Sequence, residues 1–407
     1  IKTMISDLEQ IYSISIKGMK KSVIRELLKL TQRPEIISFA GGLPAPESFP
    51  IEQLKEISCE VLENDGSAAL QYGATEGVTE LRQIMVDRYN GQGLNIKLKN
   101  LVITTSSQQG LDLLAKIFIN RGDKVICGLP SYLGGLGAFN SYGAEMIGIK
   151  FDEHGMRSDI LEEKLAELKT QGIKPKFIYI IPDFQNPAGI TMPESRRIEV
   201  IAIAKKYDIL IVEDSPYREV RFEGKAQKTI HELDNSGQVI LLGTFSKIFV
   251  PGFRIGWVVA HEKIVDKFVT AKQSTDLCTP TLNQKIAHKY IEKGYFDKNL
   301  TEIIVQYREK RNNMLKAFKE FMPEGVKWTE PEGGLFLFLT LPEHMDAEVL
   351  FQKAIENNVA FVLGSVFHCD GSGKNTMRIN FSFMPKDKTT EGVKRLANAI
   401  KEEMAIA

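Results

Sequence analysis

The fold is decided by the stretch Gly243-Thr-Phe-Ser-Lys-Ile-Phe-Val-Pro-Gly-Phe-Arg-Ile-Gly-Trp257, which follows the apolar run 239–242. It brings two hydroxyls, a lysine and an arginine into one short segment. A lysine among apolar neighbours loses solvent, which lowers its pKa and makes its amine nucleophilic, and an arginine binds phosphate through paired hydrogen bonds. A solvated surface loop would account for a lone Ser-Lys pair. The turn-forming Pro251-Gly252 between Lys247 and Arg254 favours a functional segment instead.

The composition is that of an ordinary globular protein with balanced charge. Of the 407 residues, 43% are apolar and 26% are charged, and 52 basic residues balance 52 acidic ones. A chain of this length usually forms two packed units. Because the net charge offers no field that would recruit nucleic acid or an anionic membrane, we expect neither as a partner.

The cysteines and the apolar segments predict the compartment. Four cysteines (Cys59, Cys127, Cys278 and Cys369) are dispersed without a CxxC pair, which argues against a disulfide framework or a zinc site and favours a reducing compartment. No segment approaches the ~18 apolar residues of a membrane span, and no signal-peptide pattern opens the sequence. We therefore expect a cytoplasmic enzyme without a metal ion.

Short apolar runs alternate with helical segments through the first part of the chain. The strand-like runs are 101–104, 124–127, 145–149, 177–181, 209–212 and 239–242, and helical patterns cover 108–119, 158–171 and 193–206. This alternation predicts right-handed crossovers and a mostly parallel α/β sheet that is covered on both faces. In such sheets, ligands bind beyond the carboxyl ends of the strands.

Beyond Thr270 the pattern changes to a long helix followed by mixed strands and helices, which predicts a smaller α+β unit. We therefore expect a large domain at residues 51–290 and a small C-terminal domain at residues 291–407. Residues 1–50 are predicted to form an N-terminal helix and arm that pack with the small domain. In this arm, Gly41-Gly42 allows a close backbone approach to a bound molecule, although a plain turn would explain it as well.

Polar side chains follow several of the predicted strands. Ser107-Gln108 opens a helix whose free N–H groups suit an anion, or simply caps that helix. Asn186-Pro-Ala-Gly189 follows another strand and, alone, is a common turn. Asp214 lies at the end of an apolar strand, where an acid needs either a ligand cation or a neighbouring Lys or Arg, and Tyr217 comes shortly after it.

With Lys247, these groups are the parts that a pyridoxal phosphate site needs. A lysine forms a Schiff base, a carboxylate holds the pyridine nitrogen protonated, and a phenol and an amide bind the ring hydroxyl. The ordered set Asn186-Pro-x-Gly, Asp214-x-x-Tyr217, Ser246-Lys247 and Arg254 resembles the pattern of the fold-type I pyridoxal-phosphate aminotransferases.

This resemblance extends over nearly the whole chain. Within the family, the sequence is most similar to the 2-aminoadipate and the kynurenine/aminoadipate aminotransferases, in segments 23–28, 39–46, 70–72, 107–113 and 185–187. It implies a large domain with a mostly parallel sheet of the seven-stranded type covered by helices, plus a smaller α+β domain. It also implies pyridoxal 5′-phosphate as the cofactor and a homodimer as the active unit.

The resemblance assigns roles residue by residue. Lys247 would be the Schiff-base lysine and the base that moves the substrate proton. The implied cofactor contacts are Asp214 at the pyridinium, Asn186 and Tyr217 at the ring oxygen, Tyr132 on the ring face, Ser107, Gln108, Thr244, Ser246 and Arg254 at the phosphate, and Tyr72 reaching the phosphate of the partner subunit. The implied substrate contacts are Arg378 at the α-carboxylate, Gly42, Asn186, and Arg25 at a distal carboxylate. Without the resemblance, Arg378 would be a strand residue facing solvent and Arg25 a solvated helix residue.

The implied function is the transfer of an amino group from an amino acid to 2-oxoglutarate by a ping-pong mechanism. The donor would be 2-aminoadipate, an aromatic or a branched or aliphatic amino acid. A C–S lyase or another fold-type I enzyme would use the same cofactor motifs and is an open alternative. A transcription regulator with an aminotransferase-like domain is disfavoured, because the roughly forty residues before Gly41 are too few for a winged-helix module plus a linker and the chain has no basic excess.

Overall fold

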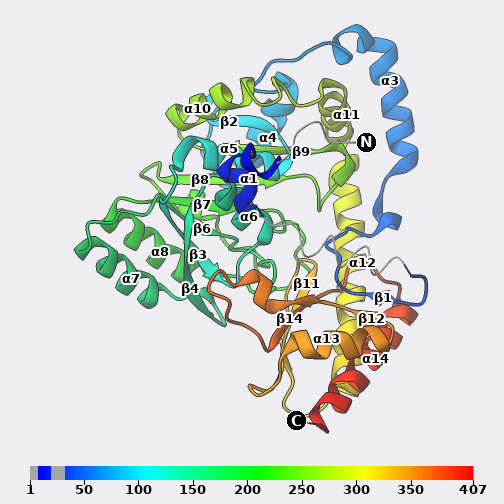
Figure 1. The fold of residues 1–407 in the computed structure, drawn as a ribbon. Coiled ribbons are helices and arrows are strands. Elements are labelled where there is room, and N and C mark those ends of the chain that lie inside the picture. Colours follow the sequence, from blue (N-terminus) through cyan, green and yellow to red (C-terminus); the bar gives the residue numbers. More distant parts are fainter. Residues whose placement is uncertain (1–7, 20–32, 407) are drawn as a thin grey trace.

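The computed structural model describes residues 8–19 and 33–406, and its main layer is an eight-stranded sheet (Figure 1). In spatial order the strands are β2 (Leu101–Thr105), β9 (Ile255–Val259), β8 (Val239–Thr244), β7 (Leu210–Asp214), β6 (Phe177–Ile180), β3 (Lys124–Leu129), β4 (Glu145–Asp152) and β5 (Gly155–Met156). Strands β3, β4, β6, β7 and β8 are parallel, whereas β9 is antiparallel to both of its neighbours. This confirms the predicted mostly parallel sheet, to which the two-residue β5 adds an antiparallel edge.

Helices cover both faces of this sheet, and the side chains of its central strands alternate between two apolar clusters. In β6, Phe177 and Tyr179 belong to one cluster, and Ile178 and Ile180 belong to the other. The helices of this part are α3 (Ile51–Ala69), α4 (Thr79–Gly91), α5 (Ser106–Phe118), α6 (Leu133–Ser141), α7 (Ser158–Thr170), α8 (Glu194–Tyr207), α9 (Ile230–Leu233), α10 (Glu262–Gln273) and α11 (Thr281–Glu292). Helix α5 packs against β8 and β9, whereas α7 packs against β4, α8 against β7, and these two helices against each other.

The C-terminal part is built on a four-stranded antiparallel sheet with the order β10-β11-β14-β13. Its elements are α12 (Tyr295–Phe321), β10 (Lys327–Trp328), β11 (Phe336–Thr340), α13 (Ala347–Glu356), β12 (Val359–Ala360), β13 (Val362–Leu363), β14 (Thr376–Asn380) and α14 (Lys386–Met404). The long helix α12 contacts α11 at one end of the molecule and α14 at the other (Figure 1). This is the smaller α+β unit that the sequence predicted.

The N-terminal arm is joined to the C-terminal part by backbone pairing. Strand β1 (Ile37–Ser38) pairs in parallel with β12, and the Phe39 carbonyl accepts a hydrogen bond of 2.9 Å from the Asn380 N–H. This pairing leads the following residues, Gly41-Gly42, to the carboxyl edge of the large sheet, where Gly42 meets Lys247. A short helix, α1 (Ile14–Gly18), packs against α6. The domain boundaries at residues 50 and 290 stay a prediction.

Short 3-10 turns complete the fold, and two of them border the carboxyl edge of the large sheet. The turns are η1 (Leu8–Gln10), η2 (Pro46–Ser48), η3 (Leu98–Asn100), η4 (Pro251–Phe253) and η5 (Gly364–Phe367). Turn η4 lies in the quoted stretch between β8 and β9, and η5 precedes β14. In the described part of the chain, no helix is long and apolar enough to cross a membrane.

Candidate active site

Lys247 lies just beyond the carboxyl end of β8 and points toward the N-terminal arm. Its Nζ donates a hydrogen bond of 2.7 Å to the carbonyl oxygen of Gly42. Burial lowers the pKa of Lys247 to about 8, and the positive charges of Arg378 and Arg254 act in the same direction. A lysine in this state has a much larger neutral, nucleophilic fraction near pH 7 than a solvated one. The prediction of a desolvated lysine therefore agrees with the structure.

Asp214 ends strand β7 and is 2% exposed. Tyr179, on the neighbouring strand β6, donates a hydrogen bond of 2.7 Å to Asp214 Oδ2. The other oxygen, Oδ1, has no hydrogen-bond partner among the described residues. Burial raises the pKa of Asp214 to about 6, against the lowering effect of the Tyr179 hydrogen bond. No Lys or Arg in the described part pairs with this carboxylate, so the salt-bridge alternative is not realised there and Oδ1 is available to a ligand.

A hydrogen-bonded chain of three buried side chains crosses from the C-terminal part to the large sheet. Arg378, on β14, donates from Nη1 to Asn186 Oδ1 at 2.9 Å and from Nη2 to the Ala40 carbonyl at 2.9 Å. Asn186 Nδ2 in turn donates to the Tyr217 hydroxyl at 3.2 Å. Arg378 is 2% exposed, so it does not face solvent as its strand position alone would suggest. Burial lowers the pKa of Arg378 to about 10, which leaves the guanidinium charged at neutral pH.

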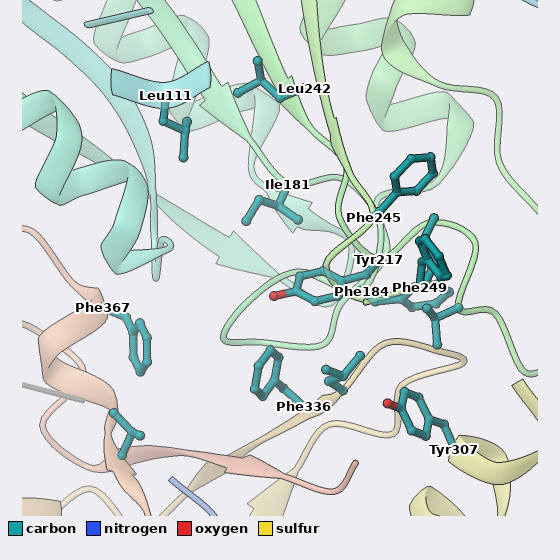
Figure 2. Packing of buried hydrophobic residues seen from close by; sticks show 14 of the residues in the cluster. Leu111, Ile181, Phe184, Tyr217, Leu242, Phe245, Phe249, Tyr307, Phe336 and Phe367 are labelled. Carbon is teal, nitrogen blue, oxygen red and sulfur yellow. The ribbon is translucent and has the colours of Figure 1, made fainter. Parts of the chain in front are cut away.

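Two phenylalanine rings hold the Arg378 guanidinium between them. The guanidinium carbon is 4.3 Å from the ring centre of Phe336 and 5.2 Å from that of Phe367. Phe336 also meets Tyr217 edge-to-face at 5.9 Å, and a Cβ on Gly42 would come within 3.4 Å of the Phe336 ring. Figure 2 shows Phe336 close to Tyr217, and Phe367 on the turn η5. The ring of Phe336 therefore lies next to Gly42, Tyr217 and Arg378.

Three buried hydroxyls form a cluster where β8 meets the start of α5. The Thr244 hydroxyl donates to Ser246 Oγ at 2.9 Å, and Ser106 Oγ lies 3.5 and 3.4 Å from these two oxygens. Ser106 has a left-handed backbone with φ of 64°. A Cβ on Gly256 would come within 2.6 Å of the Ser107 backbone nitrogen, so glycine is required for β9 to lie this close. Hydroxyls beside the free N–H groups of a helix start suit a phosphate.

The other predicted residues surround this centre or lie apart from it. Arg254 is exposed, and its charge reaches Lys247. Tyr132 stands before α6, and burial followed by the charge of Asp214 raises its pKa. Gln108 Nε2 donates to the Gly134 carbonyl at 3.0 Å. Tyr72 is 79% exposed and is not brought to this centre within one chain; Arg25 lies outside the described residues.

Sequence reasoning missed four residues of this centre: Tyr179, Ser106, Phe336 and Phe367. Tyr179 is the polar tip within an otherwise apolar strand, a signal that could have pointed to a buried hydrogen-bond partner. Ser106 stands next to the predicted Ser107 and differs from it in its backbone conformation. The two phenylalanines carry no such signal, because their sequence context is that of any core residue.

The arrangement matches a pyridoxal-phosphate site on a fold-type I scaffold. The buried acid offers a free oxygen to a ring cation, the hydroxyl cluster offers donors to a phosphate, and the lysine with lowered pKa directly follows Ser246 of that cluster. In the described part of the chain, no group of three or more His, Cys, Asp or Glu side chains could hold a metal ion. The class of protein that this fold and site define is a pyridoxal-phosphate-dependent enzyme of fold type I.

Comparison with known proteins narrows this class. Residues 37–396 match the pattern of the family described as aminotransferase class I and II. The chain is 50% identical to aromatic-amino-acid aminotransferase 1 of Thermococcus litoralis, covering 98% of this chain and 96% of that protein. It is 40% identical to the 2-aminoadipate transaminase of Thermus thermophilus, covering 95% and 96%. The kynurenine aminotransferase structure of Pyrococcus horikoshii superposes with a TM-score of 0.95 at 48% identity, covering 99% of this chain and 100% of that one.

The chain belongs to the class I and II aminotransferases. The enzyme class, the fold-type I scaffold and the cofactor, pyridoxal phosphate, are those that the sequence motifs predicted.

Proposed function

We propose that the protein transfers the amino group of an aromatic amino acid or 2-aminoadipate to 2-oxoglutarate by a ping-pong mechanism. The observation that carries this proposal is that Lys247 and Arg378 donate to the nearby carbonyls of Gly42 and Ala40, and that Tyr217 lies within reach of the charges of Arg378 and Asp214. The names of the relatives, which include aromatic-amino-acid and 2-aminoadipate aminotransferases, support the two donor classes. We place the reaction in the cytoplasm, and the free state of the four cysteines supports a reducing compartment.

The cofactor residues follow from the polar groups that the site leaves available. Asp214 would hold the ring nitrogen protonated, Asn186 and Tyr217 would bind the ring oxygen, and Tyr132 would pack on the ring. The phosphate would be held by residues of α5 and of the segment 243–257, namely Ser107, Gln108, Thr244, Ser246 and Arg254. When bound, pyridoxal phosphate draws electron density from the substrate Cα and stabilises the negative charge that develops there.

The protein residues then act on the substrate. Lys247 holds and moves the Cα proton. Its pKa of about 8 suits this role, because a base transfers protons most effectively when its pKa is close to the working pH. Arg378 orients the α-carboxylate through its planar guanidinium. Its geometry is held by Asn186 and by the Ala40 carbonyl, so it is pre-organised before substrate arrives. Gly42, whose carbonyl accepts from Lys247, borders the same substrate space.

A homodimer is part of the proposal. Tyr72 and the nearby Leu70 are 79% and 71% exposed in the single chain, which leaves the Tyr72 phenol free to reach a second copy. In such a dimer, Tyr72 of the partner subunit completes the phosphate site. The family resemblance assigns Arg25 to a distal carboxylate, which 2-oxoglutarate also carries. In half-reactions run without an acceptor, Arg25→Gln should therefore slow the conversion of 2-aminoadipate and glutamate while leaving that of aromatic donors unchanged.

The test is a panel of amino donors with 2-oxoglutarate as acceptor, measuring glutamate formation. We expect parallel lines in double-reciprocal plots, because each half-reaction finishes before the other begins. Lys247→Ala should abolish both turnover and the absorbance of the lysine-bound cofactor. A Lys247→Ala protein that still transfers the amino group at the wild-type rate would contradict the proposal.

The same panel of substrates distinguishes the proposed aminotransferase from the alternative, a C–S lyase. A C–S lyase acting on cystathionine releases ammonia and a thiol, whereas amino transfer releases neither.

Arg378→Lys keeps the charge but loses the planar guanidinium, so kcat/KM should fall by about 100-fold, the scale of losing one or two charged hydrogen bonds. Arg121→Lys, at an exposed arginine before β3, is the matched control and should retain wild-type kinetics.

A further inference from the structure

Two cysteines that are far apart in the sequence meet at the border between the two parts of the protein. Cys127 lies in the middle of β3 and is fully buried, and Cys369 follows the turn η5 and is exposed. Their Sγ atoms are 3.7 Å apart, across 242 residues of chain. Their scattered positions in the sequence hid this proximity.

The pair stands beside the candidate active site without belonging to it. Strand β3 leads into Ser131, whose N–H donates a hydrogen bond of 2.8 Å to the Phe367 carbonyl. The ring of Phe367 in turn lies 5.2 Å from the Arg378 guanidinium. A covalent bond between the two sulfurs would therefore add a second tie, next to this hydrogen bond, between the large sheet and the turn that backs Arg378.

The local structure allows the sulfurs to approach. A disulfide needs a separation of about 2.05 Å, so the sulfurs must move together by less than the radius of one atom. The loop that carries Cys369 contains Gly371 and Gly373 with φ of 75° and 71° and connects to β14 without a helix, which leaves the Cys369 side room to adjust. Because β3 is an inner strand of the sheet, Cys127 supplies the fixed partner.

We infer that Cys127 and Cys369 form a redox-active pair, a modification site for small disulfides of the glutathione class, which closes to an intramolecular disulfide and fixes η5 to β3. The order of attack follows from exposure. The hydrogen bond from Cys127 lowers the pKa of Cys369 and raises that of Cys127, so the exposed thiol reacts first.

The reaction is balanced by two exchanges. The Cys369 thiolate attacks one sulfur of the small disulfide, whose S–S bond breaks and whose other half leaves as a thiolate that takes a proton. Cys127 then loses its proton and attacks the Cys369 sulfur, releasing the second small thiol. The net result is one protein disulfide formed from two thiols and one small disulfide reduced to two thiols.

The test uses the cofactor-loaded holoenzyme carrying Cys59→Ser and Cys278→Ser, so that the proposed pair supplies the only thiols. After incubation with oxidised glutathione, we expect the loss of both titratable thiols, a mass lower by two hydrogens, and a peptide that links Cys127 to Cys369. The melting temperature should rise by about 5 °C, the effect of closing so long a loop in the unfolded chain of this size. Dithiothreitol should reverse each change.

Two matched variants in the same background separate the steps. Adding Cys127→Ser should stop the reaction with one glutathione attached to Cys369 and no rise in melting temperature. Adding Cys369→Ser, an exposed change that leaves the core intact, should prevent reaction with glutathione disulfide. The inference is overturned if the background protein keeps both thiols, stops at a glutathione adduct, or closes the bond without any thermal shift.

Discussion

The carboxylate of Asp214 should destabilise the protein when no cofactor is bound, and Asp214→Asn should relieve that cost. Burial raises the pKa of Asp214 from the 3.8 of an ordinary aspartate to about 6. A difference of about two pKa units corresponds to about 3 kcal/mol between the charged and neutral forms. Asparagine keeps an oxygen for the Tyr179 hydroxyl and carries no charge, so most of this cost should disappear.

The sign of the pH dependence follows from the direction of the shift. Because the folded pKa lies above the unfolded one, the favourable contribution of the protonated acid is fully present below pH 3.8 and is lost as the pH rises through about 6. The cofactor-free Asp214→Asn protein should therefore match the wild type near pH 4 and exceed it above pH 6. For a chain of this size, about 3 kcal/mol corresponds to a rise of about 3 °C in melting temperature.

The assay is thermal unfolding of cofactor-free protein between pH 4 and 8, followed by the same scans with pyridoxal phosphate. Loading should reverse the order of stability, because the charged acid then has a cation beside it, and turnover of Asp214→Asn should fall by about 100-fold for an equal energy in the transition state. Asp266→Asn, an exposed aspartate on α10, is the control and should change little. An Asp214→Asn apoprotein no more stable than wild type at pH 8 would refute the reasoning.

Three further predictions test the neighbouring groups. The rate of pyridoxal phosphate uptake by the apoprotein should rise about tenfold per pH unit below pH 8 and level off above it, because the neutral amine of Lys247 is the reactive form; a flat stopped-flow profile would contradict this. Phe336→Leu should raise KM for the amino donor by about threefold to tenfold with kcat retained, since it removes the closer ring over the Arg378 guanidinium; unchanged KM would count against the role of that ring. Arg197→Met should lower stability by about 3–5 kcal/mol, because it leaves the buried Asp183 with only a distant ion pair of 4.0 Å to Arg221. Combining it with Asp183→Asn should recover part of the loss in the same unfolding assay.

The large sheet could be predicted because its strands are buried on both faces. That burial requires continuous apolar runs, such as 177–181 and 209–212, which stand out from the helical segments between them. Parallel strands also end at one edge, so polar residues after successive strands had to lie near one another. On this ground alone, the sequence predicts that Asp214 and Asn186 lie at the same edge.

Contacts that depend on how the two parts meet could not be predicted in this way. Arg378 and Asn186 are 192 residues apart, and Lys247 and Gly42 are 205 apart. Nothing in the spacing determines which strand of the C-terminal sheet faces the large one, so the role of Arg378 came only from the family resemblance. Neither strand-end spacing nor the family resemblance pointed to Phe336 and Phe367, because apolar side chains in strands and turns are typical of any core.

Two buried polar atoms of the candidate site have no partner among the described residues and favour a bound ligand there over a closed core. Asp214 Oδ1 and Arg378 Nε have no hydrogen-bond partner in the described part of the chain, and each such atom costs about 1–3 kcal/mol or more when charged. Both costs persist because the surrounding groups, Tyr179 on one side and the two phenylalanine rings on the other, hold the side chains in place. A ligand that brings a cation to Asp214 and a carboxylate to Arg378 removes both costs at once. The affinity of the protein for such a ligand then comes partly from satisfying polar atoms that are buried without partners in the free protein, and partly from new contacts.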